Sequence, residues 1–207
     1  MPLIEWNTDK QYLKDLRESG VAIPETRFIQ QDSEISLESL FLGTGFADAI
    51  IKPFVGGAAK STFRIAVNDS PQWETTWQNC LAQGGMLFQE FEPAIQHNGE
   101  ISLIYFGAEY SHAVIKRAKA GDFRVQDDHG GTVAVYHPSK HAVEIGRQIL
   151  LQAPQLPAYA RVDLLPADYE TYLLMELELI EPELFMRFAP PSAGKFAHVV
   201  KNYIISI

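Results

Sequence analysis

The sequence predicts an α+β fold with mostly antiparallel sheets. Three observations support this prediction. Expected strands outnumber expected helices, many consecutive strands are close enough to pair as hairpins, and the order of elements does not match a doubly wound parallel sheet. There is no internal repeat and no low-complexity tract. A chain of 207 residues is long enough for one large or two small domains with a sizeable core.

The individual elements follow from hydrophobic periodicity and from capping and turn residues. Thr8 is the expected N-cap of the first helix, which would stop at Gly20 and would hold Lys10 at its second position. The expected helices are Thr8 to Ser19, Ser36 to Leu42, Pro71 to Gln83, Ser139 to Leu151 and Ser192 to Ser206. The expected strands are 26–30, 48–55, 61–67, 86–91, 101–106, 112–117, 133–136, 161–165 and 174–179.

Composition limits the class of protein. Hydrophobic residues make up 46% of the chain and charged residues 21%, which is typical of a globular protein. The net charge of −9 argues against a general nucleic-acid surface, because phosphate backbones require clustered Lys and Arg. No apolar run approaches a membrane span and no signal pattern opens the chain, so we expect a cytoplasmic protein without membrane attachment. The single Cys80 excludes an internal disulfide framework.

The most informative feature is an acid-bearing hairpin near the C-terminus. Segments 161–165 and 174–179 alternate with period two, and the polar stretch between them is typical of a connecting loop. A turn centred on Tyr169 and Glu170 places Asp163 opposite Glu176, with Glu178 on the same face. Facing carboxylates repel one another. A hard divalent cation such as Mg²⁺ would convert that repulsion into binding.

Two lysines and a glycine loop are candidate phosphate ligands. Lys52 lies in an apolar strand and is either an edge residue or a cation directed into a cleft. Gly56 and Gly57 follow it and allow close approach of backbone amides to phosphate, although an ordinary hairpin turn explains them equally. The loop does not have Walker A spacing. Lys10, at a position where the helix dipole disfavours a cation, indicates a ligand weakly.

Two further segments have both functional and ordinary interpretations. Residues 88–93 end a strand and offer backbone groups for an adenine, or they are a solvated strand end. Lys116, Arg117 and Arg124 form a basic group that could neutralise phosphate or a substrate carboxylate, or could be surface charge.

Taken in order, these residues resemble the ATP-grasp superfamily, in particular its branch of glutathione synthetase, ribosomal-protein glutamate ligase and the cycloserine-forming cyclo-ligase. The resemblance covers nearly the whole chain, and the blocks around Asp163 and around Met175 to Pro182 are its most specific part. It implies one ATP-grasp domain over residues 1–207. Its parts would be a leading helix (1–25), a smaller ATP-lid subdomain (about 26–91) and a larger metal-binding subdomain (about 92–207).

The resemblance also implies a role for each candidate residue. The nucleotide-binding set is Lys10, Lys52, Gly56, Gly57, Glu90, Phe91, Glu100, Arg117 and Gln126. In this set the two lysines would hold the ATP phosphates, Glu90 and Phe91 would recognise adenine, and Glu100 would bind the ribose hydroxyls. Arg124 is the expected catalytic residue, which meets the acyl phosphate. The expected metal ligands are Asp163, Glu176 and Glu178, which would bind Mg²⁺, with Mn²⁺ as a second candidate.

The implied activity is ATP-dependent carboxylate–amine ligation through an acyl phosphate, with amino acids or peptides as the small-molecule substrates. The alternative is a non-catalytic nucleotide-binding or scaffold module without an acceptor domain. Two departures from the family pattern stand out. Glu178 replaces the Asn of the usual Glu-x-Asn pair, and only nine residues precede Lys10, where relatives carry an N-terminal α/β domain. The segment Phe196 to Ile207 is a candidate homodimer interface.

Overall fold

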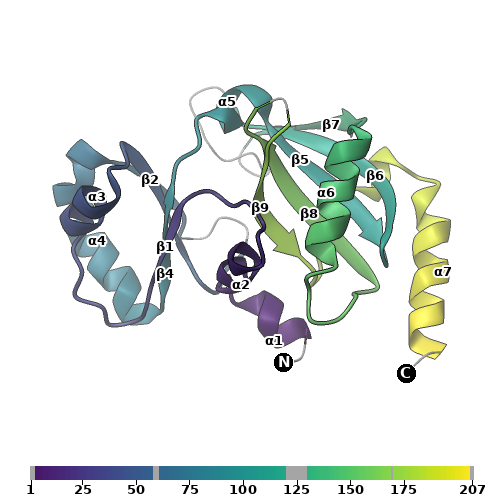
Figure 1. The fold of residues 1–207 in the computed structure, drawn as a ribbon, viewed down its shortest axis with the longest axis horizontal. Helices are drawn as coiled ribbons and strands as arrows, with labels where there is room; N and C mark the ends of the chain where they lie inside the picture. The colour runs from purple at the N-terminus through teal and green to yellow at the C-terminus, as the bar shows by residue number, and fades with distance from the viewer. Residues whose placement is uncertain (1–2, 58–60, 120–129, 169, 206–207) are drawn as a thin grey trace. The chain divides into compact units, whose positions relative to one another are not determined.

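A computed structural model of the protein describes residues 3–57, 61–119, 130–168 and 170–205. It confirms the α+β class, because its helices accompany two sheets whose described strand pairs are all antiparallel. The chain divides into two compact units (Figure 1). The larger comprises Met1–Asn7, Leu16–Ala22 and Pro93–Ile207, and the smaller comprises Thr8–Asp15 and Ile23–Glu92.

The smaller unit is a four-stranded sheet with two helices against one face. The sheet order is β1-β4-β2-β3, from strands β1 (Thr26–Ile29), β2 (Asp48–Pro53), β3 (Phe63–Ala66) and β4 (Met86–Glu90). The helices are α3 (Leu37–Thr44) and α4 (Ser70–Gln83), the latter preceded by the 3₁₀ turn η1 (Val67–Asp69). Phe41 of α3 and Trp77 of α4 pack with Phe88 of β4 in one apolar cluster. Burial of these aromatic rings holds both helices on the sheet.

The larger unit is built on a five-stranded sheet of order β7-β6-β5-β8-β9. Its strands are β5 (Glu100–Phe106), β6 (Glu109–Arg117), β7 (Thr132–Tyr136), β8 (Tyr159–Pro166) and β9 (Tyr172–Glu178). Its helices are α5 (Ala94–Asn98), α6 (Lys140–Leu150), α7 (Ser192–Ile205) and the 3₁₀ turn η3 (Met186–Phe188). Helix α1 (Leu3–Thr8) falls almost entirely in the same unit.

The two faces of this sheet have different roles, because side chains alternate along each strand. Tyr105 points to the face covered by α6, where its hydroxyl donates to the carbonyl of Val143 at 2.7 Å. Phe106 points to the other face and packs on Phe196 of α7, with ring centroids 5.4 Å apart. The same alternation places the side chain of Ser102 on the α7 face, at the end of β5 away from Phe106.

The expected first helix was wrong in its bounds. Thr8 ends α1 instead of capping a helix, and α2 begins at Tyr12 and runs to Glu18. The carboxylate of Asp9 accepts from the backbone N–H of Gln11 at 2.9 Å, so Asp9 makes the turn between the helices. Lys10 lies in that turn, outside α2. The helix-dipole argument for a ligand at Lys10 therefore fails, since the lysine is not part of the helix.

The other expected helices and strands are confirmed to within a few residues at each end. Two short helices, α1 and α5, were missed, because five or six residues are too few for a hydrophobic period to be recognised. Strand β6 begins at Glu109, three residues before its expected start, since it forms a hairpin with β5 around Gly107. None of the helices in the described part of the chain has the length and apolar character of a membrane span.

Candidate metal and nucleotide site

The expected pairing of the acid-bearing strands is confirmed, and a β-bulge makes it possible. Asp163 of β8 pairs with Glu176 of β9, whereas its neighbour Leu164 pairs with Leu174. Met175 is therefore an extra residue on β9. Because side chains alternate, an unbulged continuation of the Leu164 register would set Met175, and not Glu176, opposite Asp163. The bulge brings the acids of β9 to the face that carries Asp163.

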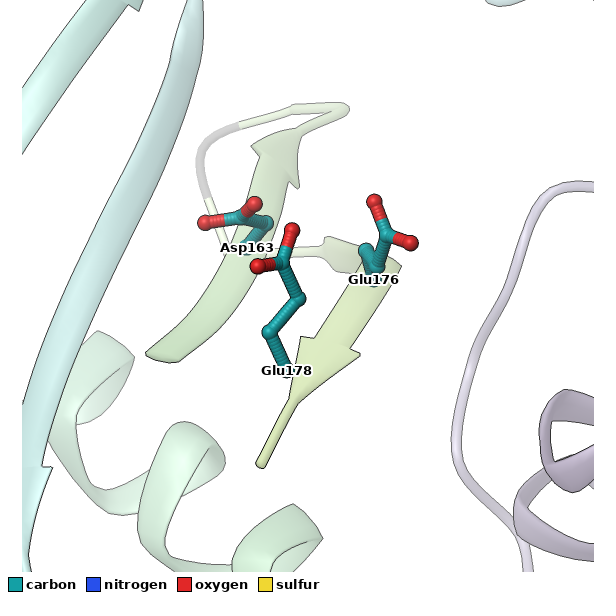
Figure 2. A group of neighbouring side chains, drawn as sticks. All are labelled: Asp163, Glu176 and Glu178. Carbon is teal, nitrogen blue, oxygen red and sulfur yellow. The ribbon is translucent and has the colours of Figure 1, made fainter. Parts of the chain in front are cut away.

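Three carboxylates converge on that face, as Figure 2 shows. We call Asp163, Glu176 and Glu178 the acid group. Each offers an oxygen, and the three oxygens lie within 4.8 Å of one another. Asp163 is only 1% exposed, because β8 is an interior strand of the sheet, while the two glutamates lie on the edge strand and are partly exposed. The partial exposure of Glu176 and Glu178 leaves the group in contact with solvent.

Arg161 is the first cation of the acid group. It lies two residues before Asp163 on β8 and therefore shares its face. Its Nε donates to both oxygens of Asp163 at 3.1 Å, and its Nη2 donates to Oδ2 of Asp163 at 3.1 Å and to Oε1 of Glu178. The planar guanidinium thus ties the two neighbouring strands together through their carboxylates.

Lys116 of β6 is the second cation. It comes from the β6 side of Asp163, whereas Glu176 and Glu178 lie on the β9 side. Its Nζ donates to Oδ2 of Asp163 at 3.0 Å and to Oε1 of Glu100 at 2.5 Å. The hydroxyl of Ser102 donates to Oδ1 of Asp163 at 2.6 Å. Asp163 is therefore held by donors from three strands, β5, β6 and β8, and its carboxylate has a fixed orientation.

Four carboxylates lie close to one another around Arg161 and Lys116, those of Glu100, Asp163, Glu176 and Glu178. Carboxylates this close repel one another. A divalent cation among the three carboxylates of the acid group would add positive charge and turn that repulsion into binding.

Two carboxyls of the acid group have pKa values that are shifted in opposite directions. Burial raises the pKa of Asp163, but Arg161 and Lys116 outweigh it and hold that pKa at about 2. Burial and the neighbouring Glu176 raise the pKa of Glu178 to about 7, against the opposing effect of Arg161. Asp163 is thus a permanent anion, and Glu178 is the carboxylate whose proton a metal would displace.

The donor set suits Mg²⁺. This ion takes oxygen ligands at about 2.1 Å in octahedral geometry, so adjacent ligand oxygens lie about 3 Å apart and opposite ones about 4 Å apart. Oxygens up to 4.8 Å apart need to close by about 1 to 2 Å to reach that spacing. A ligand set made only of carboxylates does not favour soft metals, which prefer sulfur ligands.

Several of the predicted nucleotide residues lie together in the smaller unit. The backbone N–H of Lys10 donates to the carbonyl of Phe54 at 2.8 Å, and its Nζ donates to the carbonyl of Gly56 at 2.5 Å. Lys52 is on β2, four residues before Gly56. Lys10 and the glycine loop are therefore connected directly, and the loop's exposed glycines, Gly56 and Gly57, present backbone to solvent.

The expected adenine hinge has a well-defined conformation at the end of β4. The N–H of Glu90 donates to the carbonyl of Glu25 at 2.8 Å, and the N–H of Phe91 donates to that of Asp48 at 3.1 Å. The Phe91 ring is 6% exposed and lies under the guanidinium of Arg64, whose Cζ is 3.7 Å from the ring centroid. The ring belongs to the core, so an adenine at this strand end would meet backbone groups and not the ring.

Arg117 is the remaining predicted residue that the structure describes. Arg124 and Gln126 lie outside the described residues. Arg117 ends β6 and is exposed, on the opposite face from the buried Lys116. The structure thus brings together the three acids and Glu100, and it adds Lys116 where the sequence had favoured Arg117.

Sequence reasoning missed the roles of Arg161, Lys116 and Ser102 around the acid group. For Arg161 a signal existed, because residues two apart on a strand share a face and Arg161 precedes Asp163 by two. Lys116 and Ser102 are far from Asp163 in sequence. They could be found only after the order β6-β5-β8 was known.

Comparisons with known proteins agree with this fold. No family model matches the chain. In sequence the chain is similar to the cycloserine biosynthesis protein DcsG of Streptomyces lavendulae. The two are 28% identical over 218 residues, which cover 97% of this chain and 71% of that protein.

Solved structures give the same result at the level of fold. The crystal structure of D-cycloserine synthetase DcsG matches 98% of this chain and 72% of its own, with a TM-score of 0.84 and 24% identity. D-alanine–D-alanine ligase from Bacillus anthracis, complexed with ATP, matches 94% of this chain and 64% of its own, with a TM-score of 0.69 and 15% identity. The ATP-grasp ligase PsnB, complexed with Mg and ADP, has a TM-score of 0.66 and 16% identity, over 97% of this chain and 61% of its own.

The two antiparallel sheets and these matches indicate an ATP-grasp superfamily member. Within that superfamily it is similar to D-cycloserine synthetase. The expectation drawn from the order of the sequence motifs is thereby confirmed.

Proposed function

We propose that the protein binds ATP with Mg²⁺ and catalyses carboxylate–amine ligation through an acyl phosphate. The single observation that carries the proposal is the acid group, three carboxylates on one face of the sheet whose oxygens lie within 4.8 Å of one another. The relatives support it, since an ATP complex and a Mg and ADP complex are among the matched structures.

In this proposal the acid group holds the metal, with Mg²⁺ preferred and Mn²⁺ as a second candidate. The nucleotide set named from the sequence keeps its proposed roles: the lysines on the phosphates, Glu90 and the backbone of Phe91 at adenine, and Glu100 at the ribose. The smaller unit then acts as the ATP lid and the larger as the metal-binding part. Arg124 remains the proposed contact of the reacting phosphoryl group.

The chemistry asked of the chain is positioning and charge stabilisation. Mg²⁺ and ATP, when bound, supply the Lewis acid and the γ-phosphoryl group. Arg161, fixed between Asp163 and Glu178, presents a guanidinium beside the place where phosphoryl charge would gather. No side chain needs to act as a nucleophile, because the activated carboxylate is the substrate's own.

The similarity to D-cycloserine synthetase favours a small amino-acid-derived carboxylate as substrate, with the attacking amine on the same molecule or on a second one. The chain matches 71% of that relative's length, so the complete activity is part of the proposal. A homodimer through residues 196–207 also remains a proposal.

The first test is binding. Isothermal titration of the folded protein with ATP and Mg²⁺ should show binding that EDTA abolishes. Phosphate release and hydroxylamine trapping of an acyl phosphate should then be measured across a panel of amino acids and short peptides. A folded sample that does not bind Mg-ATP would refute the proposal. Nucleotide binding without phosphate release would instead support the non-catalytic module.

The second test is the variant Glu176→Gln, which removes one metal ligand while keeping the side-chain shape. We expect Mg-dependent phosphate release to fall by at least ~100-fold, the effect of losing one preorganised charge contact in a transition state. The matched control is Glu144→Gln, which removes an exposed acid from α6. Unchanged turnover in Glu176→Gln would remove Glu176 from the site.

A further inference from the structure

Lys116 is a buried ammonium shared by two buried carboxylates. Its side chain is 5% exposed, that of Glu100 is 10% exposed, and that of Asp163 is 2% exposed. Nζ of Lys116 lies 2.5 Å from Oε1 of Glu100 and 3.0 Å from Oδ2 of Asp163. Lysine is rarely buried to this degree unless it is paired. A surface ion pair would not explain the arrangement, since surface pairs contribute little and stay exposed.

The backbone sets this geometry. Glu100 and Lys116 are directly paired residues of β5 and β6, so their side chains leave the sheet on the same face. Gly99, which precedes β5, has φ +74°, and a Cβ there would lie 2.6 Å from the carbonyl oxygen of Lys116. Only glycine allows the two strands to meet this closely at their ends. The contact of Glu100 with Lys116 is therefore a property of the fold.

Charge explains why the contact matters to Glu100 more than to Asp163. Asp163 has a second cation, Arg161, at 3.1 Å, and a hydroxyl donor from Ser102. Among the described residues, Glu100 forms its ion pair with Lys116. Burial raises the pKa of Glu100, and the Lys116 ammonium offsets only part of that shift. Removing Lys116 would leave a buried carboxyl with a strong tendency to take a proton.

We propose that Lys116 is a positioning residue, which holds Glu100 in place as an anionic acceptor for the ribose hydroxyls of the nucleotide and joins it to the metal ligand Asp163. The inference rests on the proposed function, in which Glu100 is the ribose contact. A charged carboxylate accepts both hydroxyl hydrogens, whereas a protonated one loses an acceptor position. Lys116 thus acts on the nucleotide through Glu100, without touching it.

The test compares the affinities of ADP and 2′,3′-dideoxy-ADP, both measured by isothermal titration with Mg²⁺ on the full chain. The ratio of the two affinities isolates the ribose contact. In the unaltered protein we expect a ratio of at least ~10, because hydrogen bonds to a charged group contribute about 1.5 to 3 kcal/mol. Glu100→Gln should lower the ratio about fivefold from its value in the unaltered protein, because the bond to a neutral partner is weaker than the bond to a carboxylate.

Lys116→Met should give the same reduced ratio as Glu100→Gln, and the double variant should give no further loss, since both changes act through one contact. Lys116→Arg should keep the ratio of the unaltered protein. Ser102→Ala is the matched control: it removes one of the three donors to Asp163, which keeps Arg161 and Lys116, and removes none from Glu100, so the ratio should be kept. Lys116→Gln is the second variant if Lys116→Met does not fold.

Each outcome decides the inference. It is overturned if the Lys116 variants keep the ratio that Glu100→Gln loses, if Glu100→Gln itself keeps the ratio, or if Ser102→Ala lowers it as much as Lys116→Met. A folded protein that binds neither nucleotide overturns the proposed function and this inference together. Binding with a ratio that is independent of Lys116 overturns the inference alone.

Discussion

Binding of Mg²⁺ should release a proton from Glu178, with a magnitude set by pH. The pKa of this carboxyl is raised from 4.5 to about 7, first by burial and then by Glu176. A metal ligand must be deprotonated, so metal binding below pH 7 has to displace the proton. At pH 6 about 90% of Glu178 is protonated, and at pH 8 about 10%. Release should therefore be about 0.9 proton per metal at pH 6 and about 0.1 at pH 8.

The same shift predicts the pH dependence of affinity and stability. Apparent Mg²⁺ affinity should rise about tenfold per pH unit below pH 7 and level off above it. Because the folded pKa of Glu178 is raised, its contribution favours folding below pH 4.5 and is lost as pH rises through 7, a change of roughly 3 kcal/mol. The free energy of unfolding without metal should fall over that range, and Mg²⁺ should restore it.

Titration calorimetry in buffers of different ionisation enthalpy measures the protons released per metal bound. Glu178→Gln should abolish the release at pH 6 and flatten the affinity profile, while the exposed Glu144→Gln should leave both as in the unaltered protein. An absence of proton release at pH 6 would refute the reasoning, and so would a release of the same size in Glu178→Gln. Chemical denaturation with and without Mg²⁺ at pH 5 and pH 8 checks the effect on stability.

Two further predictions concern the scaffold of the site. Asn7 donates to the carbonyl of Leu177 at 2.8 Å and accepts from the N–H of Leu179 at 2.8 Å, so Asn7→Ala should lower the free energy of unfolding by about 2 to 3 kcal/mol and weaken Mg²⁺ binding. The prediction is wrong if Asn7→Ala resists urea as well as the unaltered protein does and binds Mg²⁺ with equal affinity. A Cβ at Gly146 would lie 2.5 Å from the hydroxyl of Tyr105, so Gly146→Ala should cost about 1 to 3 kcal/mol in thermal or urea unfolding, without affecting Mg²⁺ affinity if the protein folds. An unchanged melting temperature would show that α6 can move away from β5.

The acid-bearing hairpin shows how far local pattern carries. Alternation with period two identified both strands, and loop length was enough to pair Asp163 with Glu176. Near the turn, Pro166 pairs with Tyr172, so the pairing there is centred half a residue earlier in the chain than the expected turn. The bulge at Met175 restores the expected register at the acids. The prediction was right at the site although the turn on which it rested was slightly displaced.

The N-terminus shows where local pattern fails. A capping signal at Thr8 predicted one helix, yet the chain forms two, because Trp6 and Asn7 are buried and Asn7 bonds to the backbone around β9. Those contacts join residues about 170 positions apart. A single sequence contains no local signal for them. Tertiary burial therefore overrode the capping preference.

The sequence by itself determined the α+β class, most element positions, the superfamily and the identity of three clustered acids, because strand period and short loops are local properties. Only the tertiary structure decided what surrounds those acids. The order β6-β5-β8 brings Lys116 and Ser102 to Asp163 from 47 and 61 residues away, and it gives Glu100 a buried cation. Charge balance depends on distances between strands, and those distances exist only once the sheet has formed.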